Sequence, residues 1–243
     1  MITAIVQARV GSSRLPGKVL MDIGGKTMVE RVLEAARCAE SVDAVIAAIP
    51  DLPEDDALSS HIQELGYDVF RGSSDDVLDR FCGASVLSGM IPGDGVVRLT
   101  ADCPLMIPEV IDQVVEAFIN NSVCYASNVR PPTYPDGLDV EVFSFDSLCA
   151  AHEKATKKSE REHVTPYIFE SAMTTINVRN TEDLSDIRLT VDHPDDLEFV
   201  REFVLKCGSV ELPQIRAQIS SINDTRSHER NEGYAKSLSE EKP

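Results

Sequence analysis

The sequence has no tryptophan, few aromatic residues (5%), and no hydrophobic run long enough to cross a membrane. A spanning helix needs about 18 or more consecutive apolar residues, and the apolar run at residues 2–6 is also too short for a signal sequence. We therefore expect a soluble, cytoplasmic protein with no membrane partner.

Cysteine pairs and positive charge are also scarce. The six cysteines form no C-x-x-C pair and no Cys/His cluster at metal-binding spacing, so we expect reduced thiols. Lys and Arg number 23 against 41 Asp and Glu, a net charge of −18. Such a surface repels nucleic acid, which we exclude as a partner, and an anionic ligand has to enter a local basic pocket.

Acidic residues are missing altogether before Asp22, although the chain is acidic overall. The loop at residues 7–18 follows the first apolar run and carries three cations, Arg9, Arg14 and Lys18. Its small residues, Gly11, Ser12 and Ser13, let backbone N–H groups approach an anion, and the cations can meet phosphate oxygens. The spacing matches neither a P-loop nor a dinucleotide fingerprint. It predicts a polyphosphate site at a strand end, with an ordinary surface turn as the alternative.

Two aspartates follow predicted strands in the same way. Asp102 comes after the run 95–99 and Asp192 after the run 188–191, and each has a proline two residues later. Mg²⁺ is typically held by one or two carboxylates together with substrate phosphates. For each aspartate alone a helix N-cap is the more common explanation, but their recurrence beside a phosphate loop favours a metal site.

Short β-branched runs alternate with helical periodicity, which predicts an α/β fold with a mainly parallel sheet. The predicted strands are residues 3–7, 44–49, 68–70, 95–99, 123–127, 138–143, 175–178 and 188–191. The predicted helices are residues 27–39, 53–66, a segment starting after a cap at Ser73 and Ser74, then 108–121, 145–157, 160–173 and 194–206. We expect one domain over residues 1–220, with an inserted region at about 130–173 and a polar, flexible tail at 221–243.

Further polar motifs lie outside the phosphate loop. Ser73 and Ser74, in the loop 71–80, could contact a base or ribose, with Arg80 one or two turns into the following helix, and a capped helix start is the alternative. Residues suited to a polyhydroxylated anionic molecule gather in two motifs, with a salt-bridged dimer surface as the alternative. They are Tyr134, Asp136, Asp139, Glu141, Arg161 and His163.

Six ordered motifs together resemble a known family. They lie at residues 7–18, 71–80, 100–104, 134–142, 161–166 and 189–194. Over residues 2 to about 205 the chain resembles the cytidylyltransferases that make CMP-activated sugars, in the SpsF-like branch named for spore-coat polysaccharide biosynthesis. The resemblance implies a three-layer nucleotide-diphospho-sugar transferase fold, a CTP substrate, Mg²⁺, and a homodimer.

The resemblance also implies roles for single residues. Arg14 and Lys18 would contact the triphosphate and, with Asp102, would be catalytic, while Asp102 and Asp192 would hold the metal. The nucleotide-binding set it implies is Ala8, Arg9, Gly11, Ser12, Ser13, Arg14, Lys18, Ser73 and Thr100. Ala101 stands where glycine is common in the family, and Ser74 where an acidic residue is usual.

The predicted reaction is attack by a hydroxyl of a sugar acid, such as a 2-keto-3-deoxy sugar acid, on the α-phosphorus of CTP, with pyrophosphate leaving. Such a step depends on positioning and charge stabilisation and needs no covalent nucleophile. Two alternatives stay open at this point. One is a nucleotidyltransferase that uses another nucleoside triphosphate or a sugar 1-phosphate, and the other is a nucleotide-binding regulatory protein without turnover.

Overall fold

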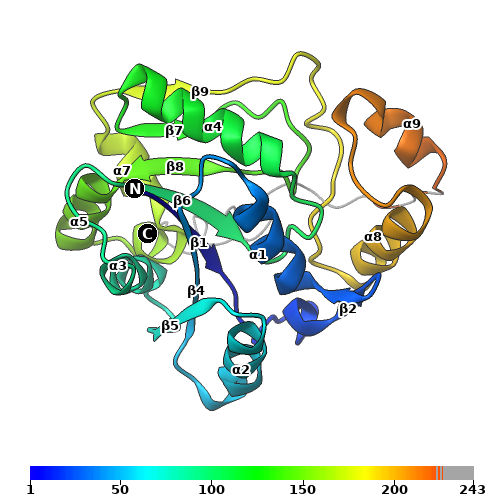
Figure 1. Ribbon diagram of the computed structural model, residues 1–243, viewed down its shortest axis with the longest axis horizontal. Helices are drawn as coiled ribbons and strands as arrows, with labels where there is room; N and C mark the ends of the chain where they lie inside the picture. The colour runs from blue at the N-terminus through cyan, green and yellow to red at the C-terminus, as the bar shows by residue number, and fades with distance from the viewer. Residues whose placement is uncertain (223, 225, 227–243) are drawn as a thin grey trace, which may run out of the picture.

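The computed structural model describes residues 1–222, 224 and 226, and its centre is a seven-stranded mixed sheet (Figure 1). Four strands run parallel, in the order β5 (Asp68–Gly72), β4 (Ala44–Pro50), β1 (Ile2–Gln7) and β6 (Gly95–Thr100). Next to β6 come β8 (Glu141–Ser144) and β7 (Tyr125–Ser127), both paired antiparallel, and then β9 (Thr175–Asn177), parallel to β7. The predicted α/β class with a mainly parallel sheet is confirmed.

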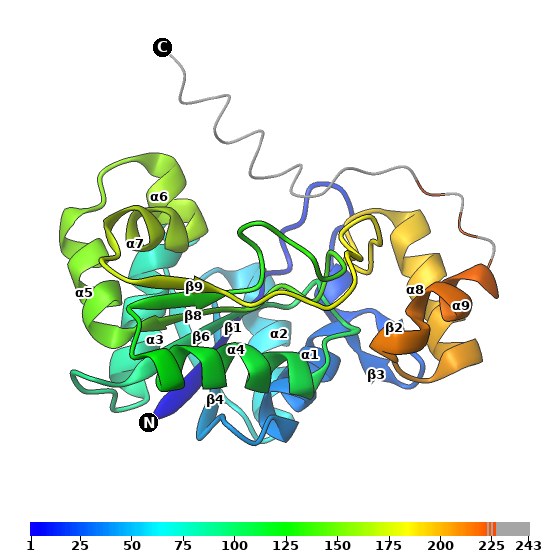
Figure 2. The same cartoon turned by 90° about the horizontal axis from the view of Figure 1, so that it is seen from above.

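One face of the sheet is covered by three helices, α1 (Met28–Cys38), α2 (Asp56–Glu64) and α4 (Pro108–Asn121). Thr27 starts α1 with a capping box to Glu30, and Pro108 stands in the first turn of α4, where its missing N–H costs nothing. Figure 2 shows α1 and α4 together on one side of the sheet.

The other face is covered by α3 (Val77–Leu87), α5 (Phe145–Lys154) and the short helices α6 (Lys158–His163) and α7 (Thr165–Ser171). The two faces have separate hydrophobic cores because alternate strand residues point in opposite directions. In β1, for example, Ala4 and Val6 pack towards α1 and α4, while Ile5 packs towards α3 and α5.

The remaining elements lie beside the sheet. A 3₁₀ turn, η1 (Lys18–Leu20), leads into the hairpin of β2 (Asp22–Ile23) and β3 (Lys26–Thr27), which packs against α8 (Pro194–Cys207). Two more 3₁₀ turns, η2 (Pro53–Asp55) and η3 (Leu212–Gln214), precede α2 and α9 (Ile215–Ser220). Figure 1 shows α8 and α9 together at one side of the molecule.

Several predicted elements have to be corrected. Residues 188–191 form no strand but one isolated bridge, from Arg188 to Asp136. The predicted helix 160–173 is broken at Val164, whose φ of +68° is rare for a β-branched residue. The cap of α3 is Asp76, whose carboxylate accepts the N–H of Asp79, and the predicted serine cap is wrong.

The predicted tail begins with ordered contacts. Ile222 is buried, and the Arg226 side chain is 5% exposed and forms ion pairs. A flexible tail over residues 221–243 stays a prediction. Residues 223, 225 and 227–243 lie outside the described residues.

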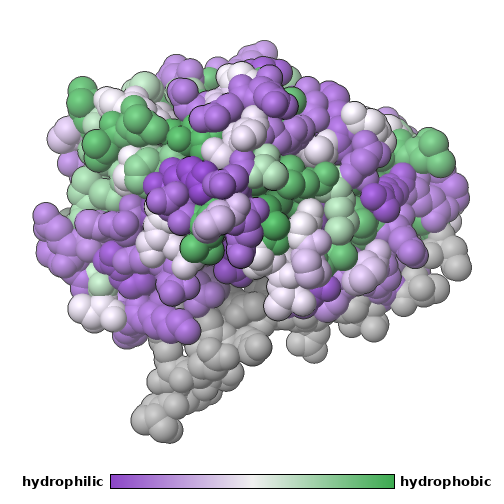
Figure 3. Space-filling model, turned by 90° about the horizontal axis from the view of Figure 1, so that it is seen from below, coloured by the Kyte–Doolittle hydropathy of each residue, from purple (hydrophilic) through white to green (hydrophobic). Residues whose placement is uncertain are grey.

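The described surface gives no sign of a membrane span. No helix among the described residues is long and apolar enough to cross a bilayer. On the face drawn in Figure 3, hydrophobic residues form separate patches among hydrophilic ones.

Candidate active site

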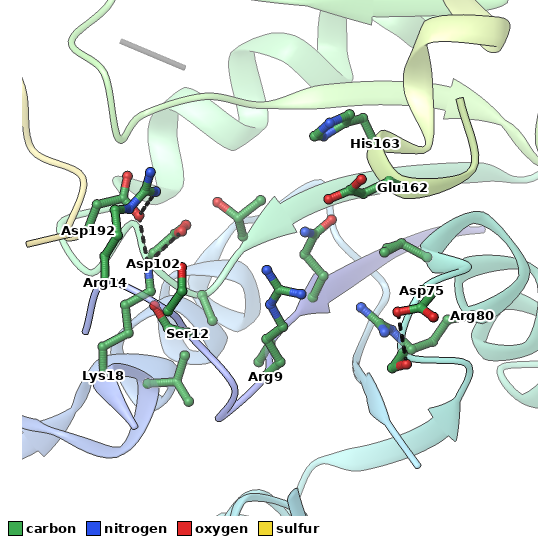
Figure 4. A pocket seen from close by; sticks show the side chains of 18 of the residues that line it. Arg9, Ser12, Arg14, Lys18, Asp75, Arg80, Asp102, Glu162, His163 and Asp192 are labelled. Atoms are coloured by element: carbon green, nitrogen blue, oxygen red, sulfur yellow. Dashed lines mark hydrogen bonds and ion pairs between the residues drawn. The ribbon is translucent and has the colours of Figure 1, made fainter. Parts of the chain in front are cut away.

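A cavity of about 620 Å³ opens at the carboxyl ends of β1 and β6, where parallel α/β sheets usually bind ligands. Most predicted nucleotide and metal residues line it: Ala8, Arg9, Ser12, Ser13, Arg14, Lys18, Thr100, Asp102 and Asp192. Two predicted nucleotide residues, Gly11 and Ser73, are not among its lining residues. Figure 4 shows the labelled side chains spread along the cavity, with Lys18 and the two aspartates at one end and Arg80 at the other.

Lys18 joins the two predicted metal aspartates. Its Nζ lies 3.1 Å from Asp102 Oδ2, 3.0 Å from Asp192 Oδ1 and 2.8 Å from the carbonyl oxygen of Val191. The Arg14 guanidinium also reaches Asp192 Oδ1, at 2.7 Å. The first loop and two later chain segments therefore meet at one point, which we call the Lys18 cluster (Lys18, Arg14, Asp102 and Asp192).

The charges in this cluster shift one another's pKa values. Burial alone would lower the pKa of Lys18, but Asp102 and Asp192 outweigh burial and raise it. Burial would raise the pKa of both aspartates, but Lys18 outweighs it and holds each pKa below its ordinary range. Lys18, Asp102 and Asp192 are therefore charged at neutral pH.

Neither aspartate is a helix N-cap, so the structure removes the alternative reading of both. The N-cap of α4 is Ile107, five residues after Asp102, and the N-cap of α8 is His193. The carboxylates are directed to Lys18 instead.

Arg188 holds Asp192 from the other side. Its Nη2 lies 3.0 Å from Asp192 Oδ2, and its Nη1 lies 2.7 Å from Asp136 Oδ2. Gly137 makes this approach possible, because its φ is +106° and a Cβ there would lie 2.8 Å from the backbone of Leu189. Asp136, predicted to contact an acceptor, is thus a buried partner of Arg188 and not a lining residue.

The oxygen atoms around Lys18 Nζ suit a hard cation. Two carboxylates and one carbonyl converge there with no sulfur or nitrogen donor, and Asp102 keeps 29% of its side chain exposed towards the cavity. Among the described residues no group of three or more His, Cys, Asp or Glu side chains could hold a metal ion by itself. The residues therefore fit Mg²⁺ held by two carboxylates together with substrate phosphates.

Two arginines of the cavity, Arg9 near its middle and Arg80 at its far end, have no carboxylate hydrogen-bond partner among the described residues (Figure 4). Arg9 makes no hydrogen bond or ion pair with any described residue. Arg80 is 2% exposed, donates from Nη1 to the carbonyl of Ser73, and has no described partner for its Nε. Burial, and then the charge of Arg9, lower the pKa of Arg80 to about 10. An anion between these two arginines would be stabilised.

Helix α6 lies over the cavity and contributes Lys158, Glu162 and His163 (Figure 4). The sequence predicted His163 but missed Lys158 and Glu162, which are four residues apart and share a helix face. It chose Arg161 instead, which points to α3 and pairs with Asp76. The helical spacing of Lys158 and Glu162 was the signal in the sequence that could have identified them as one face of a helix.

Other lining residues were missed by the sequence reasoning. They are Gln7, Val19, Asp75, Val77 and Ala101. Ser74 and Arg80, named with the loop 71–80, do line the cavity, and Arg80 in the first turn of α3 donates to the carbonyl of Ser73.

Three further predicted acceptor residues lie away from the cavity lining. Glu141 is buried and accepts hydrogen bonds from Arg98 at 2.6 Å and Tyr125 at 2.5 Å. Tyr134 is buried and donates to Gln113 Oε1 at 2.7 Å. Asp139 is half-buried and is also outside the lining. Of the six predicted acceptor residues, the geometry brings His163 alone to the cavity.

Comparison with known proteins agrees with this geometry. A family model described as cytidylyltransferase matches residues 3–222. The spore coat polysaccharide biosynthesis protein SpsF of Bacillus subtilis is 32% identical over 225 residues, covering 89% of this chain and 90% of that protein. The 8-amino-3,8-dideoxy-manno-octulosonate cytidylyltransferase of Shewanella frigidimarina is 35% identical over 119 residues, covering 48% of this chain and 47% of that protein.

A solved structure leads to the same family. A cytidylyltransferase from Leptospira borgpetersenii superposes with a TM-score of 0.83 at 28% identity, covering 93% of this chain and 99% of that one. The family model spans the whole sheet and both ends of the cavity. The chain therefore belongs to the cytidylyltransferase family, a family of CTP-dependent nucleotidyltransferases.

Proposed function

We propose that this protein transfers CMP from CTP to a hydroxyl group of a sugar acid, giving a CMP-sugar and pyrophosphate. The observation that carries the proposal is the convergence of the cationic first loop with Asp102 and Asp192 on one cavity, in a chain of this family. The octulosonate cytidylyltransferase among its relatives supports a sugar acid as the acceptor.

Four cations would stabilise the triphosphate. Arg14 and Lys18 lie at one end of the cavity, Arg80 lies at the other and Arg9 lies between them, so phosphates can lie along the floor (Figure 4). When the acceptor oxygen bonds to the α-phosphorus, the bond to the β-phosphate oxygen breaks and negative charge gathers on pyrophosphate. Fixed cations that face this charge lower the barrier without any covalent intermediate.

Asp102 and Asp192 would hold Mg²⁺. When bound, the ion neutralises phosphate charge and fixes the phosphate oxygens relative to the protein. Lys18 lies between these two carboxylates and would keep them in place.

Helix α6 would contact the acceptor. Lys158 and His163 can pair with the acceptor carboxylate, and Glu162 can accept from its hydroxyl groups. These residues fall inside the region 130–173, which we continue to assign to acceptor binding and to a homodimer contact. A cytoplasmic location also stays a prediction.

A panel of 2-keto-3-deoxy sugar acids with CTP and Mg²⁺, followed by mass detection of the CMP product, tests the proposal. We expect a CMP-sugar with at least one acid, and no product when UTP, ATP or GTP replaces CTP. Product with a sugar 1-phosphate alone, or with another nucleotide alone, would contradict the substrate assignment. CTP binding without pyrophosphate release for any acid would favour a nucleotide-binding protein without turnover.

A further inference from the structure

Arg226, close to the end of the described chain, lies against the loop that carries Asp192. Its Nη1 lies 3.1 Å from Asp196 Oδ1, and its Nη2 donates to the carbonyl oxygen of Arg188 at 2.8 Å. Its guanidinium lies 3.5 Å from the ring centroid of Phe199, on α8. The Arg226 side chain is 5% exposed and is therefore packed between α8 and the loop that precedes it.

Asp196 connects Arg226 to the backbone of the metal-site loop. Asp196 is fully buried, and its Oδ2 accepts the N–H groups of Asp192 and His193, both at 3.0 Å. Its Oδ1 faces Arg226 and, at 3.4 Å, Arg188 Nε. One carboxylate thus fixes the backbone of Asp192 with one oxygen and binds Arg226 with the other.

Arg188 has more carboxylates around it than one guanidinium can neutralise. Asp136 and Asp192 lie at 2.7 and 3.0 Å, while Asp196 is the most distant at 3.4 Å. Because Arg226 lies closer to Asp196, Arg188 can keep its two terminal nitrogens on Asp136 and Asp192. Without Arg226, the buried Asp196 carboxylate would draw Arg188 towards itself, since a buried charge needs a partner.

The planar fork of Arg226 suits this position. Asp224 holds it from the solvent side, 2.8 Å from both Nε and Nη2, while the same group contacts Asp196 and the Arg188 carbonyl. A lysine carries one donor centre and cannot make these contacts together or lie flat over an aromatic ring.

We propose that Arg226 is a positioning residue for Asp192: it binds Asp196 and so keeps Arg188 and the loop before α8 in the arrangement that presents Asp192 to Mg²⁺ and CTP. Arg226, which stands 34 positions after Asp192 in the chain, thereby sets the position of the proposed metal ligand Asp192. The inference rests on the proposed function, because it takes Asp192 as a ligand of the CTP-bound metal.

Calorimetric titration of CTP into the full chain, at a series of Mg²⁺ concentrations and also in EDTA, tests this role. We expect Arg226→Ala to raise the Mg²⁺ concentration needed for half-maximal CTP affinity about tenfold, as outer partners of metal ligands do. We expect no difference in EDTA, because Arg9, Arg14 and Arg80 are untouched. A merely structural loss would weaken both measurements equally.

Arg216→Ala is the matched control. Arg216 is also a C-terminal arginine with two carboxylate partners, Glu182 and Asp186, but these pairs lie on the exposed surface away from the cavity. We expect its Mg²⁺ dependence to match the wild type.

Arg226→Lys keeps the proposal testable if Arg226→Ala does not fold. It retains the charge and the aliphatic stem, and we expect a smaller shift in the same direction, about threefold. A wild-type Mg²⁺ dependence in a folded Arg226 variant would overturn this inference and leave the proposed function standing. Failure of the wild type to bind CTP at any Mg²⁺ concentration would instead overturn the proposed function.

Discussion

The ion pairs around Lys18 and those around Arg98 use the same kinds of side chain but lie in different parts of the sheet. The Lys18 cluster lies beyond the carboxyl ends of β1 and β6, in loops that line the cavity. The second group, which we call the Arg98 network, consists of Arg98, Glu141, Tyr125 and Gln7 and lies on the strands themselves, where Gln7, at the end of β1, also lines the cavity.

The two groups differ in how far their carboxylates are open to the cavity. Both oxygens of Glu141 are bonded, to Arg98 and to Tyr125, and Glu141 is 5% exposed. Asp102 pairs with Lys18 but keeps 29% of its side chain exposed, and it lines the cavity. A buried, satisfied carboxylate holds strands together, whereas a strand-end carboxylate beside a cavity is available to a ligand.

Of the substitutions considered, Asp102→Asn in the Lys18 cluster should have the largest effect, and this effect should be on turnover. Loss of one carboxylate removes half of the predicted metal ligands, and we expect the rate of pyrophosphate release to fall by about 100–1,000-fold. Asp186→Asn is the control, because Asp186 pairs with Arg216 on the exposed surface. Turnover within a few-fold of the wild type for Asp102→Asn would refute its catalytic role.

Glu141→Gln should act on stability instead. It removes the charge opposite Arg98 in a buried pair, and we expect the free energy of unfolding in urea to fall by about 3 kcal/mol. Turnover of the folded fraction should stay close to the wild-type value. A large rise in the acceptor KM, with stability unchanged, would restore Glu141 as an acceptor contact.

The same pair predicts a pH dependence of stability. Burial would raise the pKa of Glu141, but Arg98 and the Tyr125 hydroxyl outweigh it and hold the pKa below its ordinary value of 4.5. The pair therefore stabilises the fold fully above about pH 4.5, and this contribution is lost as the pH falls through the depressed pKa. Urea unfolding from pH 6 to pH 3 should show the gap between wild type and Glu141→Gln closing by at most about 1.4 kcal/mol per pH unit. A constant gap would argue against the depressed pKa.

Tyr134→Phe should give the smallest effect. It removes one hydrogen bond, to Gln113, outside the cavity lining, and we expect a loss of about 1 kcal/mol in stability. The acceptor KM should not change. An increased KM would show that Tyr134 reaches the acceptor after all.

The sequence was sufficient to predict an element or a site where a residue pattern is typical of a single structure. Pro108 at the first position of a helix, followed by an apolar stripe, predicted α4 with its observed bounds. The strand-end rule predicted that the cationic first loop and the two aspartates lie at one edge of the sheet, and Lys18, Asp102 and Asp192 do meet there. Phosphate binding by this loop stays a prediction.

The sequence was insufficient where tertiary contacts determine whether a segment forms a strand and where a side chain lies. The alternation at 188–191 looks like a strand, but Arg188 and Thr190 face Asp136 through side-chain bonds and the backbone makes a single bridge. The orientation of α6 places Lys158 at the cavity and directs Arg161 to Asp76. The sequence alone does not reveal this orientation. Arg226 stands in a polar segment with no hydrophobic stripe, and its buried place depends on tertiary contacts with Phe199 and Asp196 of α8 and with the carbonyl of Arg188.

Calorimetric titration of Mg²⁺ and CTP into Asp102→Asn and Glu141→Gln most directly tests whether the two groups have different roles. We predict that Asp102→Asn weakens CTP affinity in Mg²⁺ by at least about tenfold, while folded Glu141→Gln binds as the wild type does. Wild-type affinity for Asp102→Asn together with weakened binding by Glu141→Gln would contradict the account, because it would place the nucleotide site in the Arg98 network.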